Sequence, residues 1–306
     1  MDDALLEAFQ RGERRALARL LTRIAHGQGN EFLHRLPTPA RTSRIIAITG
    51  SGGVGKSTLI GKLIGHIRRQ GKSVAVLACD PQSPLSGGAL LGDRFRMPAT
   101  PSDDGVFIRS VVAESGQGAL AKHLPQMVRL LESFGFDVVL IETVGAGQGD
   151  TAARGLADVL VLLLQPEMGD DLQWEKAGVL EVADIVAIHK ADLPGADSAA
   201  AQVRAALDLA GDSSVPVLKV SARTGEGISA LWEAIAKLSA RPGQPAIDGA
   251  ELLGMAREEL DRRFACASHN PQVSRLLEDW HRQKLNARDA VASLLRLLGE
   301  LPSEES

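Results

Sequence analysis

Residues 50–58 read Gly-Ser-Gly-Gly-Val-Gly-Lys-Ser-Thr and match the pattern G-x-x-x-x-G-K-[ST] without a mismatch. A short apolar run before them, residues 44–49, has the length and β-branching of a buried strand. The apolar residues after the stretch recur at the spacing of an amphipathic helix: Leu59, Ile60, Leu63, Ile64 and Ile67. The stretch therefore lies between a strand and a helix, where backbone N–H groups and a helix N-terminus can cradle phosphate groups.

This phosphate-binding loop predicts a nucleoside triphosphate as the ligand. Its glycines let the backbone turn tightly and approach the ligand without a Cβ. Lys56 is expected to reach the β- and γ-phosphates, and Ser57 to bind Mg²⁺. A Gly-rich turn without a ligand is the alternative, and the complete motif in its strand-to-helix setting argues against it. The expected nucleotide contacts are Gly50, Ser51, Gly52, Gly53, Val54, Gly55, Lys56, Ser57 and Thr58.

Strand-like apolar runs alternate with helix-length segments through the middle of the chain. After the first strand they lie at residues 73–79, 106–109, 137–141, 158–164, 184–188 and 215–220. This alternation predicts an α/β fold with a mostly parallel, doubly wound sheet of the P-loop NTPase type. Ligands of such sheets bind beyond the carboxyl ends of the strands. The polar residues expected at those ends are Asp80, Glu142, Lys190, Asp192 and Ser221.

Helical extensions are expected on both sides of this P-loop domain. A helical apolar stripe with a break at Gly12 marks an N-terminal extension, which we expect to pack against the main domain. Residues 241–248 have the Pro- and Gly-rich composition of a linker, and further helices follow it. The predicted division is residues 1–42, residues 43–241 as the P-loop domain, and residues 242–306 as a C-terminal helical segment.

Composition excludes several other classes of protein. With 306 residues, 44% hydrophobic, 24% charged and a net charge of −4, the chain resembles an ordinary globular protein without the positive charge that nucleic acid or an anionic membrane attracts. Aromatic residues make up 3%, too few to predict a base-stacking platform. The apolar runs are too short to span a bilayer, and Cys79 and Cys266 form neither a disulfide framework nor a zinc pattern. We expect a cytoplasmic protein without a nucleic-acid or membrane partner.

The run Glu-Thr-Val-Gly at residues 142–145 follows a strand that suits the position beside the loop strand. A carboxylate there can hold Mg²⁺ or its water, and the N–H of Gly145 can meet the γ-phosphate. An ordinary solvated carboxylate is the alternative. The Gly-dense residues 145–150 that follow fit a mobile switch, in which Gln148 or Asp150 can orient the attacking water.

The run His-Lys-Ala-Asp at residues 189–192 sits where a guanine-specifying Asn-Lys-x-Asp motif would sit. Asp192 can accept hydrogen bonds from guanine N1–H and N2–H, a donor pattern that adenine lacks. Lys190 can lay its aliphatic stem along the base. Ser221 and Ala222, at the end of the last strand, can offer a backbone N–H to guanine O6. His189 replaces the expected Asn, and we predict GTP rather than ATP on the polarity of Asp192.

Longer segments resemble the MeaB/ArgK/MMAA family of P-loop GTPases. The most specific are Gly-Gly-x-Leu-Leu-Gly-Asp at residues 87–93 and Glu-Thr-Val-Gly-x-Gly-Gln at residues 142–148. The resemblance covers nearly the whole chain, including both helical ends. It implies a GTP-hydrolysing chaperone of adenosylcobalamin-dependent acyl-CoA mutases such as methylmalonyl-CoA mutase. Such a chaperone gates adenosylcobalamin loading and protects or reactivates the mutase, so the cobalamin cofactor concerns this chain only through its partner.

The resemblance also implies roles for individual residues. It places Asp80 and Asp93 near Mg²⁺ in a first switch, with Glu142 as the acidic residue on the Mg²⁺ side. It makes residues 145–150 a second switch and residues 166–176 a third, partner-sensing one. The C-terminal helices are expected to form a homodimer, with packing onto the main domain as the alternative. The expected catalytic set is Lys56, Asp80, Asp93, Glu142 and Gln148; the expected metal ligands are Ser57, Asp80, Asp93 and Glu142.

Three departures from the family pattern bear on base selection and on partner coupling. His189 stands in place of Asn, Gly-Asp at residues 149–150 in place of Ser-Glu, and Glu-Met at residues 167–168 interrupts a small-residue stretch. The sequence shows no built-in arginine finger, so intrinsic hydrolysis is expected to be slow and stimulated by the partner.

Two other functions compete with the chaperone. A partition or MinD-like ATPase fits Gly-Gly-Val-Gly-Lys-Ser-Thr and the Asp-Pro-Gln at residues 80–82. Ser51, however, occupies the place of the signature lysine of those ATPases. A nickel-enzyme metallochaperone GTPase is the other, and the sequence lacks its Cys/His cluster.

Overall fold

A computed structural model of the protein describes residues 2–37, 42–81, 103–113, 123–144, 149–166, 180–239, 249–267 and 270–300. The chain divides into two compact units, residues 1–240 and residues 241–306. The first unit carries the sheet and the phosphate loop, and the described part of the second is helical. The predicted boundary near residue 241 falls within residues 240–248, outside the described part of the chain.

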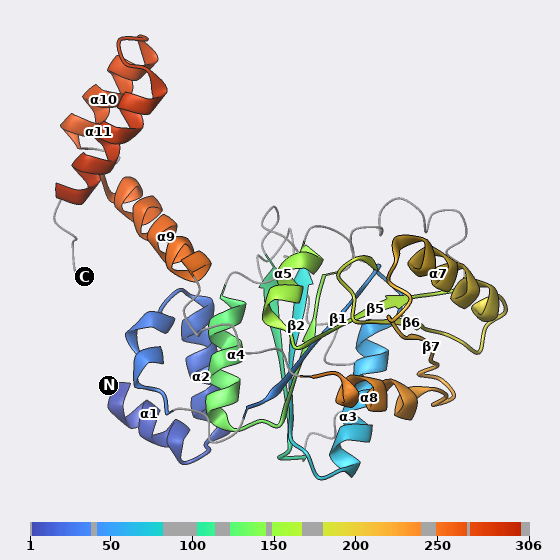
Figure 1. The fold of residues 1–306 in the computed structure, drawn as a ribbon. Helices are drawn as coiled ribbons and strands as arrows, with labels where there is room; N and C mark the ends of the chain where they lie inside the picture. The colour runs from blue at the N-terminus through green and yellow to red at the C-terminus, as the bar shows by residue number, and fades with distance from the viewer. Residues whose placement is uncertain are drawn as a thin grey trace. The chain divides into compact units, whose positions relative to one another are not determined.

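Parallel pairing joins seven strands of the described residues into one sheet, in the order β3-β2-β4-β1-β5-β6-β7 (Figure 1). The strands are β1 Arg44–Gly50, β2 Val74–Pro81, β3 Val106–Ala113, β4 Val138–Glu142, β5 Val159–Leu164, β6 Ile185–Ile188 and β7 Val217–Lys219. The predicted parallel, doubly wound P-loop sheet is confirmed. Strand β3 continues past the predicted end at residue 109, whereas β7 is shorter than the predicted 215–220.

Strand β1 lies in the middle of the sheet, between β4 and β5. Ile48 pairs with Glu142 of β4, and Gly50 pairs with Leu163 of β5. Each residue of β4 and β5 is buried, as expected for strands covered on both faces. Because all seven described strands run the same way, their carboxyl ends meet at one edge, where β1 passes into the phosphate loop.

Two layers of helices cover the sheet. Helices α3 Lys56–Arg69 and α8 Ile228–Lys237 pack on the face that carries Ile46 and Ile48. On the face that carries Ala47, the packing helices are α1 Asp2–Gln10, α2 Arg14–Ala25, α4 Leu124–Phe134 and α5 Gly149–Leu156. Helix α7 Ala196–Ala210 packs on Leu162 and Leu164 of β5 and on β6. The alternation of side chains along each strand thus separates the two layers.

The N-terminal helices belong to the core of the first unit. Gly12, with φ of 79°, separates α1 from α2, as the break in the apolar stripe predicts. Leu17, Leu21 and Ile24 of α2 are at most 1% exposed and lie in the same apolar cluster as α4 and the sheet. Two short 3₁₀ turns follow, Gly29–Glu31 and Leu33–Arg35. The expected packing of these helices against the main domain is therefore present.

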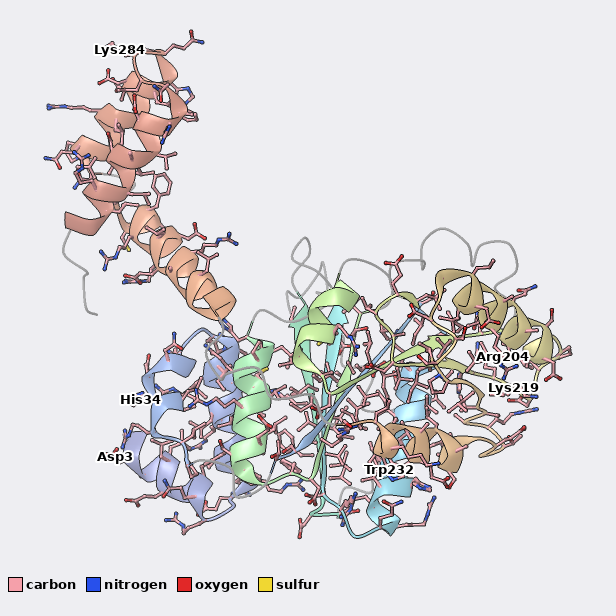
Figure 2. The ribbon with its side chains drawn as sticks, viewed as in Figure 1. Asp3, His34, Arg204, Lys219, Trp232 and Lys284 are labelled. Carbon is pink, nitrogen blue, oxygen red and sulfur yellow. The ribbon has the colours of Figure 1, made fainter. Side chains whose placement is uncertain are left out.

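Side chains of the outer helices α7 and α8 form hydrogen bonds within the first unit; Arg204 and Trp232 are labelled in Figure 2. Trp232 of α8 donates its indole N–H to Gln70 at the end of α3, at 3.0 Å. At the β7 edge, Arg204 of α7 donates to the carbonyl oxygen of Val217, at 3.1 Å.

The described part of the second unit consists of α9 Gly249–Ala267, α10 Pro271–His281 and α11 Ala287–Glu300. Asn270 caps α10, because its side chain accepts from the N–H of Gln272 and Pro271 occupies the first turn. The buried apolar residues in the described part of this unit are Ala267, Val273, Ala290 and Leu298. None of the helices in the described ranges of the chain has both the length and the apolarity that a membrane crossing requires.

Candidate nucleotide-binding site

The phosphate loop begins where β1 ends and finishes where α3 begins. Gly50 has φ of 144°, and a Cβ on it would overlap the carbonyl oxygen of Leu163 on the neighbouring strand. Gly55 caps α3 in the left-handed region with φ of 102°, and a Cβ there would lie 2.5 Å from the ring of His189. Both positions therefore require glycine for backbone conformation and for space.

The middle of the loop faces open space. A Cβ added to Gly52 or Gly53 would meet no described atom within 4 Å. The first N–H groups of α3 lie directly beyond the loop and carry the positive end of the helix dipole. Such a cradle of glycines and helix N–H groups fits phosphate oxygens.

Lys56 folds back over the loop that it follows. Its ammonium group donates to the carbonyl oxygens of Gly50, at 2.9 Å, and Ser51, at 3.2 Å. The side chain is largely buried. These hydrogen bonds hold the positive charge beside the open face of the loop, where the sequence predicts the β- and γ-phosphates.

Ser57 and Glu142 meet beneath the loop. The hydroxyl of Ser57 donates to Oε1 of Glu142 at 2.7 Å, and both side chains are buried. Beside them, Thr143 donates to the hydroxyl of Thr49 at 2.9 Å. A hydroxyl and a carboxylate in contact are hard oxygen donors of the kind that Mg²⁺ prefers, so these residues fit the metal predicted here.

Asp80 is the last residue but one of β2, at the same edge of the sheet. Its side chain is 4% exposed. In the register between β2 and β4, Ala78 pairs with Glu142, so Asp80 lies just beyond that pair in the direction of the strands' carboxyl ends. Of the predicted metal ligands, the structure thus places Asp80 and Glu142 at the carboxyl-terminal parts of neighbouring strands, with Ser57 of α3 in contact with Glu142.

His189 lies between the phosphate loop and the segment that follows β7. Its Nδ1 is 2.7 Å from the carbonyl oxygen of Val54, and the N–H of Ala222 donates to its Nε2 at 3.4 Å. The ring is 4% exposed, and burial lowers its pKa below the ordinary value. The hydrogen bond to Val54 and the charge of Asp192 act against that lowering, while Lys190 adds to it.

The residues predicted to read the base gather around His189. Lys190, with φ of 57°, donates to Gln165 at 2.8 Å and to the carbonyl oxygen of Gly53 at 3.3 Å. Asp192 accepts a hydrogen bond from the hydroxyl of Ser221. That hydrogen bond is the first cause of a lowered pKa of Asp192, with the charge of Arg223 as a further cause.

Sequence reasoning missed two residues of this cluster. The carboxylate of Asp192 forms an ion pair with Arg223 at 2.8 Å, and Gln165 holds Lys190 at the end of β5. Arg223 directly follows the predicted Ser-Ala pair, and this position in the sequence could have indicated that it lies near Asp192. Gln165 comes directly after the apolar run of β5, which was a signal as well.

Several predicted site residues lie outside the described residues. They are Asp93, Gly145 and Gln148, together with residues 167–176 of the third switch. Asp150 lies in α5, after Gly149. The roles predicted for these positions stay predictions.

A parallel sheet with a phosphate loop after its central strand, a lysine over that loop and a Ser–Glu pair beneath it define a P-loop nucleoside triphosphatase. Residues 16–245 match the family described as methylmalonyl-CoA mutase-associated GTPase MeaB, and the chain belongs to this family. The protein is accordingly a GTPase that hydrolyses GTP to GDP and phosphate.

The chain is also similar to individual proteins and to a solved structure. The chain is 42% identical over 243 residues to a Pyrococcus abyssi protein whose name places it among the GTPases, covering 77% of this chain and 75% of that protein. It is 38% identical over 200 residues to the fused isobutyryl-CoA mutase of Cupriavidus metallidurans, covering 63% of this chain and 18% of that protein. The solved structure of a LAO/AO transport system kinase shares the fold, with a TM-score of 0.64, 24% identity and 97% of both chains covered.

Proposed function

We propose that this GTPase is a Mg²⁺-dependent chaperone of an adenosylcobalamin-dependent acyl-CoA mutase. Its nucleotide state would control the loading of adenosylcobalamin into the mutase and the protection and reactivation of that enzyme. One observation carries the proposal: Lys56, the Ser57–Glu142 pair and residues 189–192 surround a single loop in a member of the mutase-associated family. A relative named as a fused isobutyryl-CoA mutase supports a mutase as the partner.

The residues beneath the loop would hold Mg²⁺. Ser57 and Glu142 are already in contact at 2.7 Å, and Asp80 lies next to the end of the neighbouring strand β2. We assign Asp93 to the same set by family resemblance. When bound, Mg²⁺ would neutralise negative charge on the β- and γ-phosphate oxygens.

Lys56 would bind the same phosphates from the opposite side of the loop, and the N–H of Gly145 would meet the γ-phosphate. Gln148, with Asp150 as the alternative, would orient the attacking water. In this proposal residues 145–150 and residues 166–176 are the switches that report the nucleotide state to the partner.

The mutase would supply a catalytic group, such as an arginine finger, that fast GTP hydrolysis requires. The sequence of this chain shows no arginine finger, and a group delivered by a partner accelerates related enzymes about 10³- to 10⁵-fold. We therefore expect slow GTP hydrolysis by the protein alone and at least about tenfold faster hydrolysis with the cognate mutase. Phosphate release from GTP and from ATP, with and without an adenosylcobalamin-dependent acyl-CoA mutase, tests this. Turnover of ATP equal to that of GTP, unchanged by the mutase, would refute the proposal.

Asp192 would select guanine. Its carboxylate accepts from Ser221 and Arg223 and offers acceptor oxygens only, as guanine N1–H and N2–H require. Asp192→Asn replaces one acceptor by a donor, so GTP binding should weaken by about 10²-fold and xanthosine triphosphate, which carries an acceptor at position 2, should bind better. Titration calorimetry with both nucleotides measures this. Asp197→Asn is the control, since Asp197 pairs with Lys219.

The second unit would form a homodimer. Its described buried core is small, yet several large apolar side chains are exposed: Leu253, Phe264, Trp280, Val291 and Leu295. A helical unit of this size rarely stabilises itself with so small a core, and a second copy would cover these side chains.

A cytoplasmic location, predicted from the short apolar runs and the cysteine content of the sequence, belongs to the same proposal. Fractionation of cells that express the protein tests it, and recovery of the protein outside the cytoplasmic fraction would contradict it.

A further inference from the structure

His189 is held from three sides. Its backbone N–H donates to the carbonyl oxygen of Leu164 on β5, at 2.7 Å. Its ring lies against the backbone of Gly55, where even a Cβ would be too close. Its two nitrogens contact Val54 of the phosphate loop and Ala222 of the segment after β7. The ring therefore connects the phosphate loop directly with the segment at residues 221–222, which is predicted to read the base.

These two contacts determine the protonation of the ring. A carbonyl oxygen can only accept, so Nδ1 must carry a proton toward Val54. A backbone N–H can only donate, so Nε2 must be without a proton toward Ala222. The neutral Nδ1–H tautomer satisfies both contacts, whereas a doubly protonated ring would set Nε2–H against the N–H of Ala222.

We infer that His189 is a positioning residue that holds the base-reading segment at residues 221–222 against the phosphate loop while its ring is neutral, and that a second proton on the ring weakens guanine-nucleotide binding. The inference deepens the proposed function and rests on it for the identity of the nucleotide. It follows from the replacement of Asn by a titratable side chain at this position.

Charged groups occur on the segment that carries the ring, on the segment after β7 and on the phosphate loop. On its own segment, the positive charge of Lys190 opposes protonation and the negative charge of Asp192 favours it. After β7, Arg223 pairs with Asp192 and so reduces the influence of that carboxylate. On the phosphate loop, Lys56 donates to Gly50 and Ser51. Burial outweighs the favourable groups, and the ring pKa lies below its ordinary value of 6.5.

The sign of the pH effect follows from linkage. Above the ordinary pKa the ring is neutral in all states, and the two contacts are fully present. As the pH falls through the ring pKa of the nucleotide-free protein, that protein takes up a proton that the bound protein excludes, so affinity falls by up to tenfold per pH unit. By the same linkage, bound nucleotide must lower the ring pKa further.

His189→Asn is the matched variant, because an Asn amide also offers one donor and one acceptor but does not titrate in this range. The ring pKa of the nucleotide-free wild type is first measured by NMR, and the GDP affinity of both full-length proteins is then measured by calorimetry at pH 7.5 and at about one pH unit below that pKa, with ADP as the reference. Between the two pH values, wild type should lose at least about threefold more GDP affinity than His189→Asn. Titration of the GDP phosphate itself is common to both proteins and cancels. Equal losses, within about 1.5-fold, would overturn the inference.

A second measurement needs no variant. The ¹⁵N shifts of the His189 ring should show a protonated Nδ1 and an unprotonated Nε2 at pH 7.5, and the ring pKa should fall when GDP binds. An Nε2–H tautomer, or a ring pKa that GDP leaves unchanged, would overturn the inference. Equal affinity for GDP and ADP at pH 7.5 would instead refute the guanine assignment of the proposed function, while the ring tautomer would still test the link that His189 makes.

Discussion

Lys56 shows how a single residue serves both the fold and the proposed chemistry. Its ammonium group holds the phosphate loop through the carbonyl oxygens of Gly50 and Ser51 and keeps a positive charge at the open face. Lys56→Ala removes both the hydrogen bonds and the charge that would stabilise the transferred phosphoryl group. We expect a loss of about 10²-fold or more in kcat/KM for GTP, measured by phosphate release. Lys62→Ala, on the exposed side of α3, is the control and should leave kcat/KM within about twofold of wild type.

The negative charge of Glu132, in α4, destabilises the folded state. Burial raises the pKa of its carboxyl above the ordinary value of 4.5, and the nearby charge of Asp158 raises it further. The folded state therefore binds the proton more tightly, so the stability that this group contributes is full below pH 4.5 and is lost as the pH rises through the raised pKa.

Glu132→Gln should therefore raise the Tm at pH 7.5, because Gln carries no charge to bury. The Tm difference from wild type should nearly vanish at pH 4, where Glu132 is protonated in both states. Thermal unfolding at the two pH values measures this, with Glu7→Gln on the exposed face of α1 as the comparison. A lower Tm for Glu132→Gln at pH 7.5 would show that the carboxylate stabilises the fold.

At the scale of elements, the junction between β1 and α3 depends on glycine, whereas the interior of α3 does not. Gly50 has a positive φ and a neighbour that leaves no room for a Cβ. Gly65 lies inside α3, where a Cβ would meet Arg69 at 3.7 Å, an ordinary van der Waals distance. Replacing Gly50 by alanine should therefore destabilise the fold, whereas replacing Gly65 by alanine should stabilise it.

Gly65→Ala should increase the free energy of unfolding by about 0.5–1 kcal/mol, because alanine lowers the backbone entropy of the unfolded chain. Gly50→Ala should decrease it by about 1–3 kcal/mol through backbone strain and overlap with β5. Urea unfolding followed by circular dichroism measures both. A stabilised Gly50→Ala would mean that the loop can change conformation without cost.

At the scale of the whole molecule, the two units differ in how much apolar surface they bury. The first unit has continuous apolar clusters on both faces of its sheet, whereas the second leaves large apolar side chains exposed on all three of its described helices. On α11, Val291 is 55% and Leu295 47% exposed, one helical turn apart on the same face.

The double variant Val291→Asp/Leu295→Asp should convert the proposed dimer to a monomer, because a dimer contact through this face would bury two charges. Arg296→Asp places the same charge at another exposed position of α11 and should leave the dimer intact. Light scattering of the full-length proteins gives the mass. A wild-type monomer, or a double variant that stays dimeric, would exclude this face as the interface.

Local patterns along the chain predicted the phosphate loop, the parallel sheet and the N-terminal helices, because each depends on residues that are neighbours in sequence. The periods of strand and helix are local, and the glycines of the loop are contiguous. The same locality explains the error at the sheet edges, where β3 is longer and β7 shorter than their apolar runs, since strand ends depend on pairing with another strand.

Tertiary structure alone decided which of the polar residues meet. Ser57 contacts Glu142 across 85 residues of chain, and His189 contacts Val54 across 135. The ion pair of Asp192 with Arg223 likewise depends on β6 and β7 lying side by side. Hydrogen bonds require distances near 3 Å, and such distances between remote segments follow from strand order and register, which motif spacing does not contain. The phosphate loop could be predicted from the sequence, whereas its connection through His189 to Ala222, after β7, depends on the fold.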